Sequence, residues 1–156
     1  MGITIVDILD RPPQRVGEHH VYYSPILAYW ISFTCDEGAG EALLAEGSNG
    51  LEEVRRTKSP VGIATEVTQK EVWDFRRLSD DQPHDVQLVA LDTPGDYYLR
   101  GWIWNIYTSE DDTVRIVAVV TGDNKFELDL DETVRVEEGD WVEFRIKELC
   151  FWDENI

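Results

Sequence analysis

Carboxylates are the side chains with the clearest chemical potential in this sequence, and their chemistry is the attraction of cations and basic surfaces. Between positions 127 and 143, eight acidic residues accompany one cation, Arg135. On a strand, Glu127 and Asp129 would share one face about 6.7 Å apart, where their charges repel each other and favour a basic partner. The acidic members that we select as candidate partner-binding residues are Glu127, Asp129, Asp131, Glu132, Glu137, Glu138 and Asp140.

Other chemistry has little support in the residue types and their spacing. Asp129 to Glu132 lacks the glycine and the further ligands of an EF-hand loop. The sequence contains no GxGxxG, GxxxxGK[ST], HExxH, paired CxxC or GxSxG motif. The three histidines are not spaced as metal ligands, and Cys35 and Cys150 lie among apolar neighbours, which favours buried free thiols. We therefore predict no catalytic residues, no metal and no cofactor.

Tryptophan is the second unusual residue type. The chain has six, and the segment YYLRGWIWNIYT (97–108) is apolar on both faces of a strand. Packing between the N-terminal strands and a helix would bury both faces, and this interpretation is favoured over a core on one side and a partner on the other. Trp102 and Trp104 are thus either core residues or binding anchors, whereas Trp141 alternates with Glu143 and is expected to be exposed. All three tryptophans are candidate partner-binding residues.

The charge excludes some partners. The chain has 32 Asp and Glu against 14 Lys and Arg, a net charge of −18, and more than half of this net charge lies after Thr108. Such a field repels nucleic acid and anionic lipid, so we expect neither direct nucleic-acid binding nor membrane binding. Adaptation to high salt is the alternative explanation of this acidity to a basic partner, and it fits the low share of lysine, 4 of the 14 basic residues.

Turn-forming clusters divide the chain into strands and connections. The segment 36–50 contains four glycines and is predicted to be a mobile loop, and helices are predicted at 51–57 and, after a capping box at Thr68–Glu71, through Leu78. The predicted strands are 3–9, 26–34, 61–67, 86–92, 97–108, 113–121, 124–130, 133–136 and 141–151. Strand 26–34 is apolar on both faces and is expected to be covered on both. These elements predict a mainly β single domain over 1–156, an antiparallel meander forming a small barrel or two-sheet sandwich with one or two short helices.

These observations favour an acidic protein–protein interaction module for a basic partner protein, acting as an inhibitor, an immunity protein or a nucleic-acid mimic. A salt-adapted small β-barrel that binds nucleic acid or a small ligand is the first alternative. A small enzyme with a pocket near the 36–50 loop and His84 is the second. The opening MGITIVDILD lacks a positively charged start, so no signal peptide is expected and the cytoplasm is the predicted location. The sequence sets no oligomeric state.

Overall fold

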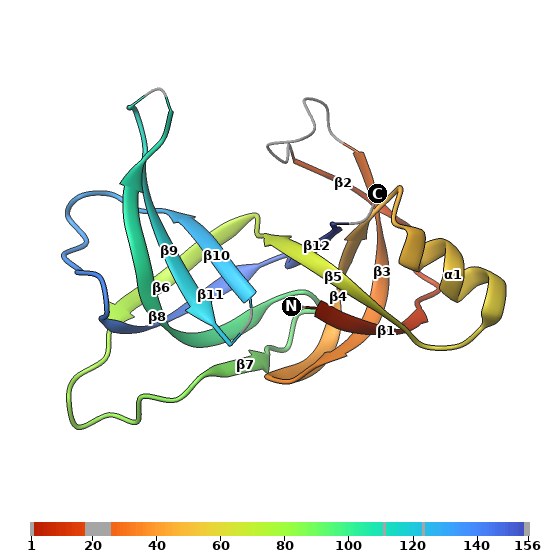
Figure 1. The fold of residues 1–156 in the computed structure, drawn as a ribbon, viewed down its shortest axis with the longest axis horizontal. Helices are drawn as coiled ribbons and strands as arrows, with labels where there is room; N and C mark the ends of the chain where they lie inside the picture. Colours follow the sequence, from red (N-terminus) through yellow and green to blue (C-terminus); the bar gives the residue numbers. More distant parts are fainter. Residues whose placement is uncertain (1, 18–25, 111, 123, 155–156) are drawn as a thin grey trace.

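The described residues form two six-stranded sheets, which lie side by side along the long axis of the molecule, and one helix beside the first sheet (Figure 1). The computed structural model describes residues 2–17, 26–110, 112–122 and 124–154. This architecture confirms the predicted mainly β fold of the small-barrel type. In the described part of the chain one short helix is present, which agrees with the predicted one or two short helices.

The first sheet closes into a five-stranded barrel. Its strands are β1 (Gly2–Ile8), β2 (Gln14–Val16), β3 (Ile26–Cys35), β4 (Gly38–Ala45), β5 (Val61–Thr68) and β12 (Cys150–Asp153). Because β1 pairs with both β5 and β3, the order β1-β5-β12-β4-β3 returns to its start, and β2 extends it beside β3. The pairing of β12 with β4 is parallel. This strand order, with the helix after the third barrel strand, is the Greek-key topology of an OB-fold.

Helix α1 (Asn49–Thr57) connects β4 to β5, as predicted for 51–57. Ser48 is its N-cap residue, and the Ser48 Oγ accepts a hydrogen bond from the Leu51 amide at 3.2 Å. This is the expected N-cap contact. The helix ends at Lys58, which has a left-handed backbone (φ 58°). Leu51 and Val54 are its buried apolar side chains, and they belong to the core cluster of the barrel.

The second sheet is inserted between the last two barrel strands. Its strands are β6 (Glu71–Arg77), β7 (Gln87–Ala90), β8 (Tyr97–Thr108), β9 (Arg115–Thr121), β10 (Asn124–Asp129) and β11 (Trp141–Lys147). They are antiparallel in the order β10-β9-β8-β11-β6, and β7 pairs with β8. Short connections between successive strands produce this meander, as the turn signals predicted.

A two-stranded ribbon joins the sheets. The pair β5–β12 belongs to the barrel, and the pair β6–β11 continues it into the second sheet, with the Lys70 amide bonded to the Lys147 carbonyl at 2.8 Å between them. The predicted single strand 141–151 is therefore two strands. The break occurs at Glu148, whose φ of 53° turns the backbone out of the extended conformation.

One hydrophobic cluster spans both sheets. In the barrel, the Phe33 and Phe151 rings meet edge to face with centroids 4.8 Å apart, and in the second sheet Phe126 and Phe144 do so at 6.1 Å. A smaller cluster covers the outer face of β3, β4 and β12, and its buried residues are Ala28, Trp30, Leu43, Ala45, Cys150 and Trp152. Strand β3 is thus buried on both faces in its middle, as predicted for 26–34, whereas Thr34 near its end is exposed.

The predicted helix through Leu78 is wrong, because Glu71–Arg77 is strand β6. A β-bulge explains the error. The register with β11 shifts, so that three steps along β6 match two along β11, and Asp74 has a φ of 51°. This extra residue places Val72 and Phe75 both on the core side, and a spacing of three therefore imitates a helical period.

The predicted mobile loop at 36–50 is also wrong, since most of it is strand β4, paired along its length with β3. Its glycines provide space. A Cβ on Gly38 would lie 2.6 Å from the Leu88 carbonyl oxygen, and one on Gly40 would lie 2.2 Å from the Tyr97 hydroxyl. No strand forms at 133–136, where the Val134 carbonyl instead accepts a hydrogen bond from Arg115 Nη1 at 2.8 Å.

Candidate functional site

The two faces of strand β8 have different surroundings. Tyr97, Leu99 and Ile103 are fully buried in the core cluster, whereas Tyr98 and Trp102 are partly exposed on the opposite, outer face. The favoured expectation that 97–108 is buried on both faces is therefore wrong. The segment that was expected to form a helix over the outer face is instead strand β6, which pairs with β11 at the edge of the same sheet and does not cover β8.

Trp104 is the most exposed large apolar side chain among the described residues, with 51% of its surface accessible. The register between β8 and β9 shifts at this point: Ile103 lies opposite Val119 and Asn105 opposite Ala118, so Trp104 is the extra residue of a β-bulge. A core position for Trp104 is thus wrong. Trp102, for which the same alternatives of core residue and binding anchor were considered, is partly buried.

The Trp104 ring meets side chains of β10 across the intervening strand β9. Ala118 of β9 is small and leaves the space above it open to longer neighbours, and it lies between Asn105 and Glu127 in the register. Lys125 Nζ lies 5.2 Å from the Trp104 ring centroid and 3.7 Å from Glu127 Oε1. The first of these is a cation–π contact. Two interstrand spacings, about 10 Å in all, separate the backbones of β8 and β10, a distance that these long side chains span.

Tyr107 connects β8 to the same carboxylate. Its hydroxyl is hydrogen bonded to the Glu127 side chain, and burial together with this acidic neighbour raises the pKa of Tyr107 to about 12. Asp129 is exposed two residues farther along the outer face of β10. We call this group the Trp104 patch, and its members are Trp104, Tyr107, Lys125, Glu127 and Asp129.

Farther along the outer face, three strands share a network of paired charges. The Tyr98 hydroxyl donates to Glu143 and accepts from Arg100 Nε at 2.6 Å. Burial and Glu143 raise the pKa of Tyr98, because both disfavour the phenolate. Asp85 pairs with Arg100 at 3.2 Å, and Arg145, which lies over the Tyr98 ring, pairs with an acid of β6. These cations are neutralised in place, so this part of the face is a structural network.

Trp141 and Trp102 are direct neighbours in the pairing of β11 with β8. The imidazole of His84 stacks on Trp141, with ring centroids 5.5 Å apart and planes 19° from parallel. Trp141, which was expected to be exposed, is therefore partly covered by the 78–86 connection and is only partly exposed.

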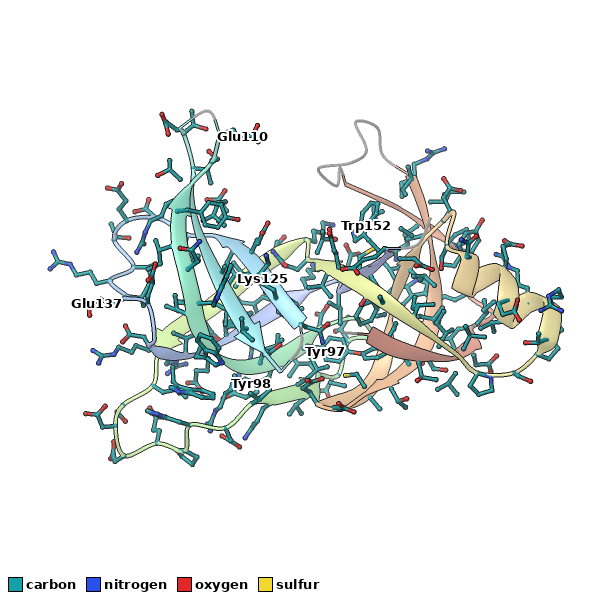
Figure 2. All side chains as sticks on the ribbon, viewed as in Figure 1. Tyr97, Tyr98, Glu110, Lys125, Glu137 and Trp152 are labelled. Atoms are coloured by element: carbon teal, nitrogen blue, oxygen red, sulfur yellow. The ribbon has the colours of Figure 1, made fainter. Side chains whose placement is uncertain are left out.

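The remaining predicted acids lie in the connection between β10 and β11. Glu132, Glu137 and Glu138 are exposed there. Asp131 caps the turn by accepting a hydrogen bond from the Thr133 amide at 2.8 Å, which lowers the pKa of Asp131. Asp140 pairs with a β6 arginine at 3.5 Å. In Figure 2, Glu137 projects at the far end of the second sheet from Lys125, so the structure divides the predicted acidic site into two groups.

A hollow in the barrel offers little chemistry by comparison. It is an open depression of about 830 Å³ at one end of the barrel. It contains Cys35, whose thiol pKa is raised by burial, and Asp153, which is already bonded to Ser48 Oγ at 2.5 Å. Both cysteines are free thiols, as predicted. No group of three or more His, Cys, Asp or Glu placed to hold a metal occurs in the described ranges, and no described helix is long and apolar enough to cross a membrane.

Comparison with known proteins gives no relative: no family model, no curated protein and no solved structure matches this chain.

Lys125 and Tyr107 are members of the Trp104 patch that the sequence did not single out. The alternation of polar and apolar residues along 124–130 predicted Lys125 on an outer face. Its contact with Trp104, however, depends on the strand order β8-β9-β10 and on the bulge. The available signal was the small residue Ala118 at the middle of an otherwise bulky strand, which indicates space for neighbouring side chains.

Proposed function

We propose that this chain is an acidic protein-binding module whose Trp104 patch contacts a basic partner protein. In this role it masks a surface on the partner that would otherwise take nucleic acid or phosphate, as an inhibitor, an immunity protein or a nucleic-acid mimic does. The proposal assigns the anchoring contact to Trp104 and the charge complementarity to Glu127 and Asp129. Asp131 and Glu132, in the connection that follows β10, add to this charge.

The observation that carries the proposal is the half-exposed Trp104 beside carboxylates. Exposing an indole to water has a cost in free energy, and tryptophan anchors within a polar rim are typical of protein–protein hot spots. Glu127 and Asp129 supply the rim with negative charge. The net charge of −18 extends this field over the molecule and favours rapid encounter with a cationic surface.

The OB-like barrel favours a second candidate, a binding module for nucleic acid or a small ligand. OB-folds bind oligonucleotides on the outer face of their second and third strands. Here those strands are β3 and β4, and their outer face is buried: Trp30 is 4% exposed, packs with β2, and carries the Arg11 guanidinium 4.8 Å from its ring centroid. This coverage weighs against stacking of bases on that face, and we rank the candidate second.

Affinity capture from lysate of the source organism, at low salt and at about 0.5 M salt, tests the proposal. The tagged wild type should recover a basic protein in stoichiometric amount, less of it at high salt because exposed charges are then screened. A quadruple variant with Glu127, Asp129, Asp131 and Glu132 changed to Lys should lose it while keeping its circular dichroism spectrum.

A matched control separates the site from the net charge. Changing four exposed acids outside the Trp104 patch to Lys alters the charge by the same amount, and these acids are Asp10, Asp80, Asp92 and Glu154. We expect the control to retain the partner. Equal loss in both variants would mean that only the overall charge matters, and retention in both would refute the acidic-face proposal.

A further inference from the structure

The Trp104 patch already contains a cation, and this cation belongs to the chain itself. Lys125 Nζ lies over the Trp104 ring at 5.2 Å from the centroid and pairs with Glu127 at 3.7 Å. About half of each of the two charged side chains remains exposed, so Lys125 is held by neither burial nor a network. Its ammonium marks the position where an aromatic face and a carboxylate together attract positive charge.

An arginine side chain suits this position better than lysine. Its planar guanidinium stacks on an indole, is less strongly hydrated than an ammonium, and can donate two parallel hydrogen bonds to one carboxylate. Glu127 provides such a carboxylate 3.7 Å from the ammonium that lies over the indole, and Asp129 provides another two residues along the strand. Lys125 lies on the same strand as both acids, and its flexible ammonium makes only a single-point contact with a carboxylate. It should therefore compete weakly with an arginine.

We infer that Trp104 and Glu127 form a recognition site for an arginine side chain of the basic partner, and that Lys125 occupies this site in the free protein and is displaced on binding. The inference rests on the proposed function and names the group that is recognised. The chain competes with its own ligand, so removing Lys125 should strengthen binding, whereas removing Trp104 should weaken it.

The test uses the full chain, ¹⁵N-labelled, and the peptide acetyl-Gly-Arg-Gly-Arg-Gly-amide at low salt. Each tryptophan gives one indole N–H signal, and Trp104→Phe identifies the relevant one. We expect the peptide to shift the Trp104 indole signal, and the same peptide with citrulline in place of arginine to leave it unmoved. Citrulline keeps the shape of arginine but has no charge, so it separates recognition of a cation from stacking alone.

Variants then test the competition. Lys125→Gln should tighten peptide binding about two- to five-fold, the range expected for losing one exposed cation–π contact. Arg135→Gln removes the same charge from an exposed position outside the Trp104 patch and should change affinity less than two-fold. Trp104→Ala should weaken binding about five-fold or more. Equal effects of Lys125→Gln and Arg135→Gln would overturn the displacement of Lys125, since net charge would then explain both.

Two further outcomes separate this inference from the proposed function. Peptide shifts confined to signals of the 130–140 connection, with the Trp104 indole unmoved, would overturn the arginine site and leave the acidic module standing. The capture experiment changes four carboxylates and leaves Trp104 intact. If the quadruple variant loses the partner but the peptide leaves the Trp104 indole signal unmoved, only the arginine site is refuted. Absence of any peptide binding at low salt refutes it as well.

Discussion

The junction between the barrel and the second sheet depends on a contact between a glycine and a tyrosine hydroxyl. Tyr97, at the start of β8, is fully buried, and its hydroxyl donates a hydrogen bond to the Glu41 carbonyl at 2.6 Å (Figure 2). A Cβ on Gly40 would lie 2.2 Å from this hydroxyl and 3.0 Å from the ring carbon that bears it. We therefore predict that Gly40→Ala and Tyr97→Phe affect the free energy of unfolding through the same atoms.

The magnitudes follow from these distances. Tyr97→Phe loses one buried hydrogen bond and leaves a carbonyl without its donor, which should cost about 1–2 kcal/mol. Gly40→Ala forces the ring to move within a packed core and should cost about 1–3 kcal/mol, reduced by about 0.5–1 kcal/mol because alanine restricts the unfolded chain. In the Tyr97→Phe background the clash with the hydroxyl no longer exists, so Gly40→Ala should cost about 1 kcal/mol less there than in the wild type.

Urea denaturation followed by tryptophan fluorescence measures all four proteins of this double-mutant cycle. Gly62→Ala on β5 is the matched control, because its Cβ would approach nothing closer than the Ile3 carbonyl oxygen at 3.9 Å. We expect this control to be neutral or slightly stabilising. Additive effects of Gly40→Ala and Tyr97→Phe, within about 0.3 kcal/mol, would refute the reasoning, since two changes that do not share a clash should add.

Four other predictions follow from burial and backbone geometry. Trp152 is 3% exposed and donates a hydrogen bond to Thr68 Oγ1 at 2.8 Å. Trp152→Ala should therefore destabilise the fold by about 3–5 kcal/mol. Trp104→Ala, which removes a half-exposed ring and one exposed cation–π contact, should cost only about 1 kcal/mol. Urea denaturation that ranks these two variants otherwise would contradict their placement. Lys58→Gly should raise stability by about 0.5–1 kcal/mol in the same assay, because Lys58 ends α1 in the left-handed conformation that glycine adopts without strain. In native protein at pH 8, a thiol reagent should label Cys35 slowly and leave Cys150 unlabelled, since burial raises the pKa of Cys150 to about 12. Both should react in urea, and rapid native labelling of Cys150 would show that it is accessible. Stability should fall as pH rises from the unfolded pKa of tyrosine, about 10, to the folded pKa of Tyr107, about 12. Because the folded-state pKa is the raised one, the contribution of Tyr107 is complete below the unfolded value and is lost through the folded value, and Tyr107→Phe should flatten this part of the stability curve.

The sequence determined the elements whose evidence is local. Alternating apolar residues and turn clusters predicted the strands at 3–9, 26–34, 61–67 and 97–108 close to their observed bounds, and Leu51 and Val54 predicted helix α1. Those signals depend on a period of two or on one helical turn, and a single segment carries them in full.

The candidate site was predicted only in part. Trp104, Glu127 and Asp129 were named from residue type and spacing, and the structure places them on one outer face of the second sheet. The grouping of those three with Lys125 and Tyr107, and their separation from Glu137 and Glu138, depended on which strands are neighbours. Pairings between segments far apart along the chain leave no periodic signal in either segment.

Only the tertiary structure decided which face of 97–108 meets solvent. The composition of that segment is apolar on both sides, so its exposure depends on whether another layer covers it. The segment that was expected to form a covering helix is strand β6 of the same sheet, and its bulge at Asp74 is the reason that its apolar spacing imitated a helix. The bulge at Trp104 places that indole on the outer face beside Lys125. Each bulge inserts one unpaired residue opposite a partner strand, and such an insertion is defined only once the two strands are paired.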